Sequence, residues 1–455
     1  MLVFIFFSRE LSQADYGTYQ NFWVQLFLLG SIATIGIPAF VLTYSPVFVR
    51  EMLGKLTTGS YFKILFWVLV VASVFAWLRH EDAGLEWYVS AGFFIVYALN
   101  AIAEAMLIVF KRFTYLMGVN LFYTFLFIWL HWGVLQDSYS MSDLFMYLLL
   151  LGVIRLVVSF GTVKSHLRTV TGIPEEEYTL ADIRSLWKHI GIYDVFNRFI
   201  TWIDKFVVSL IFTSSISAVY FNATYDIPFL PLLLGAVGGA ALMQMSTHAK
   251  ADSDTGAINV ANNMARLLSS VVFPLFFFLF IFRAELFELL LKAKYAESVP
   301  IFAVTVFIVP LRAYNFTSIL QNRHKGRVIN TGALLDAVIA FGLMYPLYQM
   351  YDLLGIALSF VISSYVQGAY YLYHTAKLLK VGILDIVPFV NWRNKIAIFG
   401  VLFVVLHYLS SIQLSSSIVL LLGCIALVIS VMVTLLIELK ASRKNHGATV
   451  SQSVD

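Results

Sequence analysis

The feature that most constrains this chain is its series of long apolar runs, separated by short polar or Gly/Pro-rich breaks. A run of about 20 apolar residues can cross a bilayer as a helix, because a helix satisfies its own backbone hydrogen bonds where no water is present. The 455 residues are 60% hydrophobic and only 12% charged, whereas soluble domains are about 45–50% apolar and about 25% charged. The sequence therefore predicts an all-α, polytopic membrane protein.

The apolar runs predict about thirteen membrane-spanning helices. Their expected positions are 19–42, 61–78, 88–110, 113–132, 143–163, 188–211, 218–245, 265–283, 299–319, 329–349, 355–376, 396–411 and 418–437. A shorter run, Met1–Phe7, precedes them. As a helix it rises only about 10 Å, which is about a third of the bilayer core.

The basic residues predict the orientation in the membrane. Most of the 30 Lys and Arg residues fall in alternate loops, beginning with the loop at 43–60. Short cytoplasmic loops are rich in Lys and Arg, so this set of loops is expected to be cytoplasmic, together with the polar C-terminal tail. The run Met1–Phe7 would then end on the outer face, at Ser8–Thr18.

An internal similarity indicates a two-fold repeat. The stretch "FSRELSQADYGTY" resembles "FTSSISAVYFNAT", which begins at Phe212, and two-fold repeats are a common build for transporters. A full helix from about Lys188 precedes Phe212, so a complete first helix would by analogy begin about 20 residues before Met1. We therefore expect a truncated first helix, and a genuinely short first helix is the alternative.

Three stretches carry a resemblance to a known family. They are "SRELSQADYGTYQ" followed by "LLGSIATIGIP"; "LLLKAKYAESVPIFAVTVFIVPLRAYNFTSILQNRHKGRVINTGALLDAVI"; and "LLGIALSFVISSYVQGAYYL". On these stretches the chain resembles the polysaccharide exporters and O-antigen flippases of the MOP superfamily. The resemblance implies two pseudo-symmetric six-helix bundles around a central cavity, plus two extra C-terminal helices.

The resemblance also implies a division of the chain into domains. We expect an N-terminal bundle with an incomplete first helix and a C-terminal bundle, joined by a cytoplasmic loop and followed by two more transmembrane helices and a cytoplasmic tail. The expected ranges are, in chain order, 1–163 for the first bundle, 164–187 for the loop, 188–376 for the second bundle, 377–437 for the additional helices and 438–455 for the tail.

Charged residues inside the predicted spans are the candidates for binding substrate, because each costs at least about 2.5–3.5 kcal/mol on insertion scales. The helix at 188–211 places Asp194, Arg198 and Lys205 on one face. Arg155 stands in "LLLLGVIRLVVSF" and has no acid within one helical turn. Arg198, Arg155 and Lys205 are expected to bind an anionic pyrophosphate, for which the guanidinium fork is well suited. A structural pair between Asp194 and Arg198 is the alternative.

Two further arginines are candidates for the same role. Arg9 matches a basic position in the family pattern and is expected to contact the pyrophosphate on exit, or to anchor the helix end. Arg312 lies within a predicted span and is the second candidate. Asp336 lies across a short loop from it, so a structural ion pair between Arg312 and Asp336 is the alternative.

Three carboxylates are candidates for ion coupling. Glu104 shares a helix face with Asn100, and Asp226 shares one with Asn222 just before a Pro-interrupted segment. Asp194 is the third. Such carboxylates could carry a proton or Na⁺. The alternative is that they serve as counter-ions for the arginines on neighbouring helices.

The sequence lacks the motifs of several other functions. It contains no HExxH, GxSxG or Walker A motif and no His/Cys cluster with metal-ligand spacing. We therefore expect no catalytic, metal or cofactor site, and a net charge of +4 gives no indication of nucleic-acid binding. The small residues of "GAVGGAAL" (235–242) are expected to allow close helix packing.

The leading hypothesis is a flippase for undecaprenyl-pyrophosphate-linked oligosaccharide in the bacterial inner membrane. It would serve O-antigen or other surface polysaccharide and lipopolysaccharide synthesis by alternating access. Membrane lipids and the polysaccharide polymerase and chain-length machinery are the expected partners. One alternative is a multidrug/cation antiporter of the same superfamily. Another is a membrane glycan polymerase or ligase, which the short outer loops disfavour.

Overall fold

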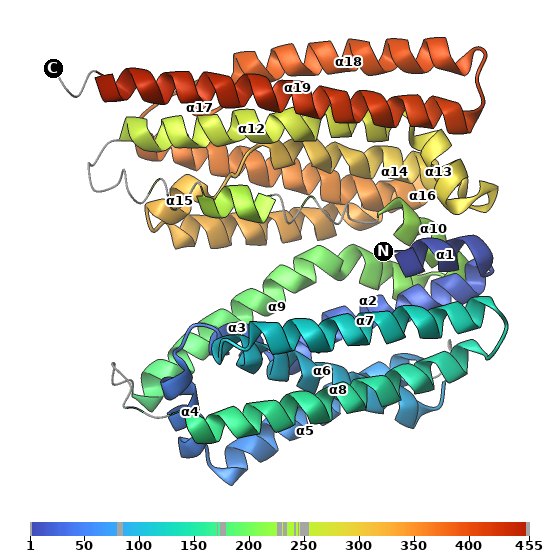
Figure 1. Ribbon diagram of the computed structural model, residues 1–455, viewed down its shortest axis with the longest axis vertical. Helices are drawn as coiled ribbons and strands as arrows, with labels where there is room; N and C mark the ends of the chain where they lie inside the picture. Colours follow the sequence, from blue (N-terminus) through green and yellow to red (C-terminus); the bar gives the residue numbers. More distant parts are fainter. Residues whose placement is uncertain are drawn as a thin grey trace. The chain divides into compact units, whose positions relative to one another are not determined.

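The computed structural model describes residues 2–79, 85–170, 172, 179–224, 230, 234–240, 243, 245 and 254–451. Every regular element in these ranges is helical (Figure 1). Eight of the described helices are long and apolar enough to cross a membrane. The prediction of an all-α polytopic membrane protein is confirmed. The chain forms two compact units, Met1–Ala218 and Val219–Asp455, which are described separately below.

Unit 1 runs from blue to green in Figure 1. Its helices are α1 (Leu2–Glu10), α2 (Gln13–Thr34), α3 (Ile37–Val41), α4 (Pro46–Lys55), α5 (Thr58–Arg79), α6 (Trp87–Val109), α7 (Phe113–Leu135), α8 (Met141–Thr169) and α9 (Leu180–Ile211), and α10 (Ser214–Ala223) spans the boundary with unit 2.

Unit 2 runs from yellow-green to red in the same figure. Its elements are α12 (Asp254–Ile281), α13 (Arg283–Leu291), the 3₁₀ turn η1 (Ala293–Tyr295), α14 (Ser298–Thr305), the 3₁₀ helix η2 (Val306–Ala313), α15 (Ser318–Asn322), α16 (Gly326–Leu379), α17 (Ile383–Ile386), α18 (Phe389–Ser411) and α19 (Ser416–Ser451).

Helix α2 forms the centre of unit 1. It packs on α5, α6 and α9, and most of its side chains are buried. The ring of Phe22 lies 5.2 Å from that of Phe75 on α5, 5.0 Å from Phe93 on α6 and 4.3 Å from Phe145 on α8. These aromatic contacts hold four helices together at one point of the core. In contrast, the outward residues of α7 are exposed, as expected for a helix that faces lipid.

The predicted span at 19–42 is broken in the structure. Helix α2 ends at Thr34 because Ile35 and Gly36 adopt left-handed backbone angles, with φ of 43° and 64°. The short helix α3 then begins at Ile37, with Pro38 in its first turn. The sequence contained this signal in "TIGIP", a glycine followed by a proline, but the continuous apolar character concealed it.

Two other predicted spans, 329–349 and 355–376, lie within the long element α16. The backbone of Asp352 is not helical (φ 50°, ψ −137°), so α16 consists of two helices joined there. A Cβ atom on Gly355 would lie 2.0 Å from the carbonyl oxygen of Leu347. Only glycine allows the two helices to approach so closely at this turn.

The C-terminal helices α18 and α19 pack on each other and on α12 within unit 2. Helix α9, in contrast, packs on α2 and α3 within unit 1. The division into bundles that the resemblance implied, with a loop at 164–187, stays a prediction. The central part of the predicted span at 218–245 lies largely outside the described residues.

Candidate functional site

Arg155 lies in the middle of α8, and two other helices of unit 1 hold its guanidinium. Its Nη2 donates to the carboxylate of Glu104 on α6 and to Oδ1 of Asn120 on α7, the latter at 2.6 Å. The guanidinium carbon also lies 4.6 Å from the centre of the Tyr123 ring on α7. Side-chain exposure is 18% for Arg155 and 32% for Glu104. The acid that α8 itself does not provide therefore comes from a helix 51 residues away in sequence.

Glu104 and Asn120 together use only the Nη2 donors of the guanidinium. Both hydrogen bonds use Nη2, whereas the buried Nε of Arg155 has no partner within the described part of the chain. Because a guanidinium carries five N–H donors in a planar fork, several remain available to an anion. Glu104 thus reduces the cost of placing a charge within the bundle and uses only part of the binding capacity of Arg155.

Arg155 lines a cavity of about 280 Å³ within unit 1. The wall is mostly aromatic, with Phe4 from α1, Trp23 and Phe27 from α2, Phe93 and Tyr97 from α6, and Tyr123 and Phe127 from α7. The size approaches the lower end of the range of about 300–1,000 Å³ for small-molecule sites, which typically combine apolar walls with a few polar groups. The cavity is therefore the best candidate for a ligand site in the described structure.

Asn100 supplies the second polar side chain of the α6 wall. It is 6% exposed, and its Nδ2 donates to the carbonyl oxygens of Val96 (2.9 Å) and Gly152 (3.1 Å). The second bond joins α6 to α8. A Cβ atom on Gly152 would lie 3.0 Å from Val96, so glycine permits this close approach. The Oδ1 of Asn100 has no partner in the described structure.

The predicted charged face of α9 lies near the same cavity. Arg198 is exposed and forms no ion pair with Asp194 among the described residues, so the structural pair that the sequence offered as an alternative is absent there. Trp202, on the same helix face as Arg198, contacts Phe27 of the cavity wall. This face of α9 therefore adjoins the cavity that Arg155 lines.

Lys205 and Arg9 lie outside the cavity lining. The Nζ of Lys205 lies 3.6 Å from the carboxylate of Asp204 and 5.6 Å from the ring centre of Trp202. Trp202 in turn contacts Phe27 of the cavity wall, with ring centres 5.2 Å apart. Arg9 is part of the last turn of α1.

The predicted residues of unit 2 do not form an ion pair. Arg312 is exposed at the end of η2, and Asp336 is buried on α16. Oδ1 of Asp336 has no hydrogen-bond partner among the described residues. Asp226 lies outside the described residues.

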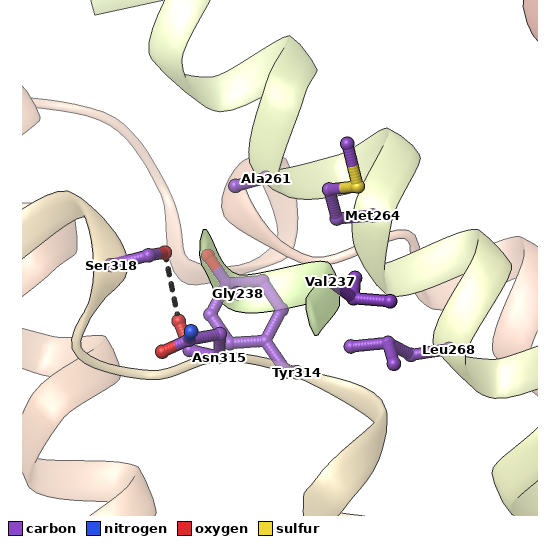
Figure 2. Close-up of a pocket in the computed structure, with 8 residues that line it drawn as sticks. All are labelled: Val237, Gly238, Ala261, Met264, Leu268, Tyr314, Asn315 and Ser318. Atoms are coloured by element: carbon purple, nitrogen blue, oxygen red, sulfur yellow. Dashed lines mark hydrogen bonds between the residues drawn. The ribbon is translucent and has the colours of Figure 1, made fainter. Parts of the chain in front are cut away.

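A smaller pocket in unit 2 lies between residues 234–240, α12 and the loop at 314–318 (Figure 2). Its volume of about 10 Å³ suffices for about one water molecule. The hydroxyl of Ser318 donates to the carbonyl oxygen of Asn315 at 3.0 Å (Figure 2), and a Cβ on Gly238 would lie 2.8 Å from Nδ2 of Asn315. Gly238 thus serves close packing, as its sequence context predicted, and the pocket is too small for a substrate.

The site residues of α7 and a buried charge cluster in unit 2 were not predicted. Asn120, which accepts from Arg155, and the lining residues Tyr123 and Phe127 follow one another at i, i+3 and i+7, a spacing that places them on one helix face and could have identified them. Lys395 on α18 and Glu438 on α19 were counted only as members of polar breaks or tails. Their partnership has no sequence signal, because each lies on a different helix.

No protein-family model and no curated protein sequence matches the chain. Among solved structures, the chain is similar to the lipid II flippase MurJ in an inward closed conformation, with a TM-score of 0.68 and 15% identity over 94% of this chain and 95% of that chain. The chain shares the fold of that protein over nearly its whole length. It is also similar to an inward-facing multidrug resistance MATE family transporter of the MOP superfamily, with a TM-score of 0.57 and 13% identity over 83% of this chain and 93% of that chain. The fold class implied by the resemblance is thereby confirmed.

Proposed function

We propose that this chain moves a lipid-linked anionic substrate across the membrane. In its specific form the proposal is a flippase for undecaprenyl-pyrophosphate-linked oligosaccharide, acting by alternating access in O-antigen or other surface polysaccharide synthesis. The observation that carries it is Arg155, a cation in the middle of a membrane helix whose guanidinium is only half occupied and lines a cavity. The similarity over nearly the whole chain to the fold of a lipid II flippase supports it.

The geometry of Arg155 suits a phosphate group. The donors on Nε and Nη1 remain open to phosphate oxygens, and charge-assisted bonds of this kind are roughly twice as strong as neutral ones. Arg198 would add a second positive charge in the same region. When no substrate is bound, Glu104 and Asn120 hold the guanidinium in place, so the site is organised before the substrate arrives. Lys205, Arg9 and Arg312 stay proposals as weaker contacts along the path.

Glu104 is our first candidate for ion coupling. Protonation of this carboxylate would release the Nη2 edge of Arg155 and increase the positive charge available to a headgroup. Asp194 is a second candidate, because it lies on α9 without an ion pair to Arg198 in the described structure. The proposed setting is the bacterial inner membrane with the C-terminus in the cytoplasm, and the polysaccharide polymerase and chain-length machinery as partners.

The proposal is tested in cells that lack this chain and carry plasmid-borne variants. Arg155→Ala and Arg198→Ala are expected to abolish surface glycan, and Arg155→Lys to restore only part of it, because an ammonium lacks the planar fork. The matched control is Arg168→Ala, which removes an exposed arginine from the same helix α8. Surface glycan is measured by immunoblot alongside the amount of protein in the membrane. Normal glycan in both alanine variants would refute the assignment.

A multidrug/cation antiporter is a second candidate, favoured by the similarity to a MATE transporter and by Glu104 beside an aromatic wall. An antiporter would bind its cation through Glu104 and the ring faces. Glu104→Gln would then abolish ethidium efflux while Arg155→Ala would spare it. A flippase would show no efflux above the background of cells without the chain.

A further inference from the structure

We infer that the aromatic cavity of unit 1 is a subsite for the first sugar of the headgroup. This inference rests on the proposed function and assigns the cavity a ligand class of its own, distinct from the phosphate contact of Arg155. The cavity combines two features that a sugar ring requires, namely flat aromatic faces and scattered polar groups with unused hydrogen-bonding capacity.

The unused polar groups are the first line of argument. Trp23 is 7% exposed and Asn100 6%, yet Nε1 of Trp23 and Oδ1 of Asn100 have no partner in the described part of the chain. The hydroxyls of Tyr97 and Tyr123, also on the wall, make no hydrogen bond to any described residue. Buried polar groups are normally satisfied, so donors and acceptors left open around one cavity point to a ligand that is itself rich in both.

The aromatic faces are the second line of argument. A pyranose ring presents axial C–H bonds on its faces and hydroxyls at its edge. The C–H bonds carry partial positive charge and are attracted to the negative face of an aromatic ring. Trp23, Phe27 and Phe93 belong to one packed aromatic group, with ring centres of Trp23 5.7 Å from Phe27 and 5.8 Å from Phe93, and all three line the cavity.

Other ligand classes fit this wall less well. An isoprenoid tail would cover the open donors and acceptors without satisfying any of them. A free phosphate could use the open donors of Arg155, but it would leave the aromatic faces and the open polar groups of Trp23 and Asn100 unused. An organic cation would need Glu104, whose carboxylate is occupied by Arg155, and Arg155 already lies over the face of Tyr123.

The position of Arg155 agrees with the order of groups in such a substrate. In a glycosyl pyrophosphate the first sugar is bonded directly to a phosphate oxygen. A phosphate held by Arg155 therefore places that sugar next to the residues that line the same cavity, Asn100 and Tyr123 among them. Arg155 would bind the phosphate and the cavity wall would bind the sugar bonded to it, so the two contacts would recognise adjacent parts of one molecule.

The test uses the phosphate-free oligosaccharide released by mild acid from the lipid carrier of cells that depend on this chain. Its binding to the purified full chain in lipid nanodiscs is measured by saturation-transfer difference NMR. Tyr123→Phe keeps its ring and removes the O–H group, and Trp23→Phe keeps an aromatic face, although a smaller one, and removes the N–H group, so each is expected to weaken binding by about three- to tenfold. Matched controls are Trp129→Phe and Tyr88→Phe, both on exposed surface, which should leave binding unchanged.

The outcomes separate the two proposals. If the wild-type chain restores surface glycan but the released oligosaccharide does not bind, or binds equally to both cavity variants, the sugar subsite is refuted and the flippase proposal stands. If tetraphenylphosphonium binds instead and Trp23→Phe weakens it, the cavity is a cation site. If the wild-type chain restores no surface glycan, the proposed function itself fails.

Discussion

The strongest stability prediction concerns the buried ion pair that joins the two C-terminal helices to each other and to α12. Lys395 on α18 is 7% exposed, and its Nζ lies 3.0 Å from Oε1 of Glu438 on α19. The same Nζ donates to the carbonyl oxygen of Arg266 (2.7 Å) and to the hydroxyls of Ser269 (2.9 Å) and Ser270 (2.8 Å), all on α12. The ammonium has three protons, so its hydrogen-bonding capacity is fully used.

Replacing Lys395 with alanine leaves the carboxylate of Glu438 buried with Asn391 at 2.6 Å and Arg266 only at 3.8 Å. Breaking a buried pair on one side costs about 3–5 kcal/mol. Hydrogen bonds between membrane helices contribute less, on average about 0.6 kcal/mol, so we take the lower end of the range. At about 2–4 °C per kcal/mol for a domain of this size, Lys395→Ala should lower the melting temperature by about 6–12 °C.

The double variant Lys395→Met/Glu438→Leu provides the decisive comparison. It removes both charges and replaces them with apolar groups of similar length, so it should recover most of the stability that the single variant loses. Thermal unfolding of purified protein, followed by fluorescence-detected size-exclusion chromatography, measures both variants. Equal melting temperatures for the wild type and Lys395→Ala, or an equal loss in single and double variants, would show that the pair is not coupled.

Three further predictions concern single positions. Gly355→Ala should destabilise the protein by about 1–3 kcal/mol, because its Cβ would meet the backbone of Leu347, whereas Gly342→Ala in the same element α16, with open space around it, should be neutral or stabilising in the same thermal assay. Ser140→Ala removes the capping box that begins α8, in which its hydroxyl accepts from Asp143 N at 3.2 Å, and should cost about 1 kcal/mol of stability, against no loss for Ser138→Ala. Glu104→Gln should bind the lipid-linked headgroup about tenfold more tightly in nanodiscs, because the competing carboxylate is gone, and should slow its delivery to the surface; unchanged affinity would contradict the proposed competition.

The overall fold could be predicted because hydrophobicity alone decides which segments enter a membrane. The apolar runs located helices α5, α6, α7 and α8 to within a few residues at most ends. Breaks inside apolar segments were harder. The helix breaks after Thr34 because Ile35 and Gly36 adopt left-handed backbone angles. The only sequence signal there was a glycine and a proline within an apolar run. The break at Asp352, in contrast, was marked by a charged residue between two apolar runs.

The candidate site could be predicted only in part, because a charge within a span indicates that it needs a partner but not which one. Arg155 and Glu104 were each identified from the cost of burial, and their pairing depends on how α6 and α8 pack. The small residues of "GAVGGAAL" predicted close packing for the whole segment, but the structure supports it only at Gly238. Gly235 and Gly239 have open space around them. The aromatic cavity escaped prediction because Phe and Tyr are abundant throughout the chain, 40 and 24 residues respectively.

The pairing of Arg155 with Glu104 has a consequence for the energetics of a transport cycle. An isolated guanidinium that moved through the membrane field would carry about 2.3 kcal/mol per 100 mV. Because the carboxylate is attached to the same bundle, the two charges travel together and cancel. In the proposed cycle this pair therefore adds no electrical work when the unloaded protein resets against the resting voltage, and the net charge moved comes from the cargo, the coupled ion and any unpaired charge.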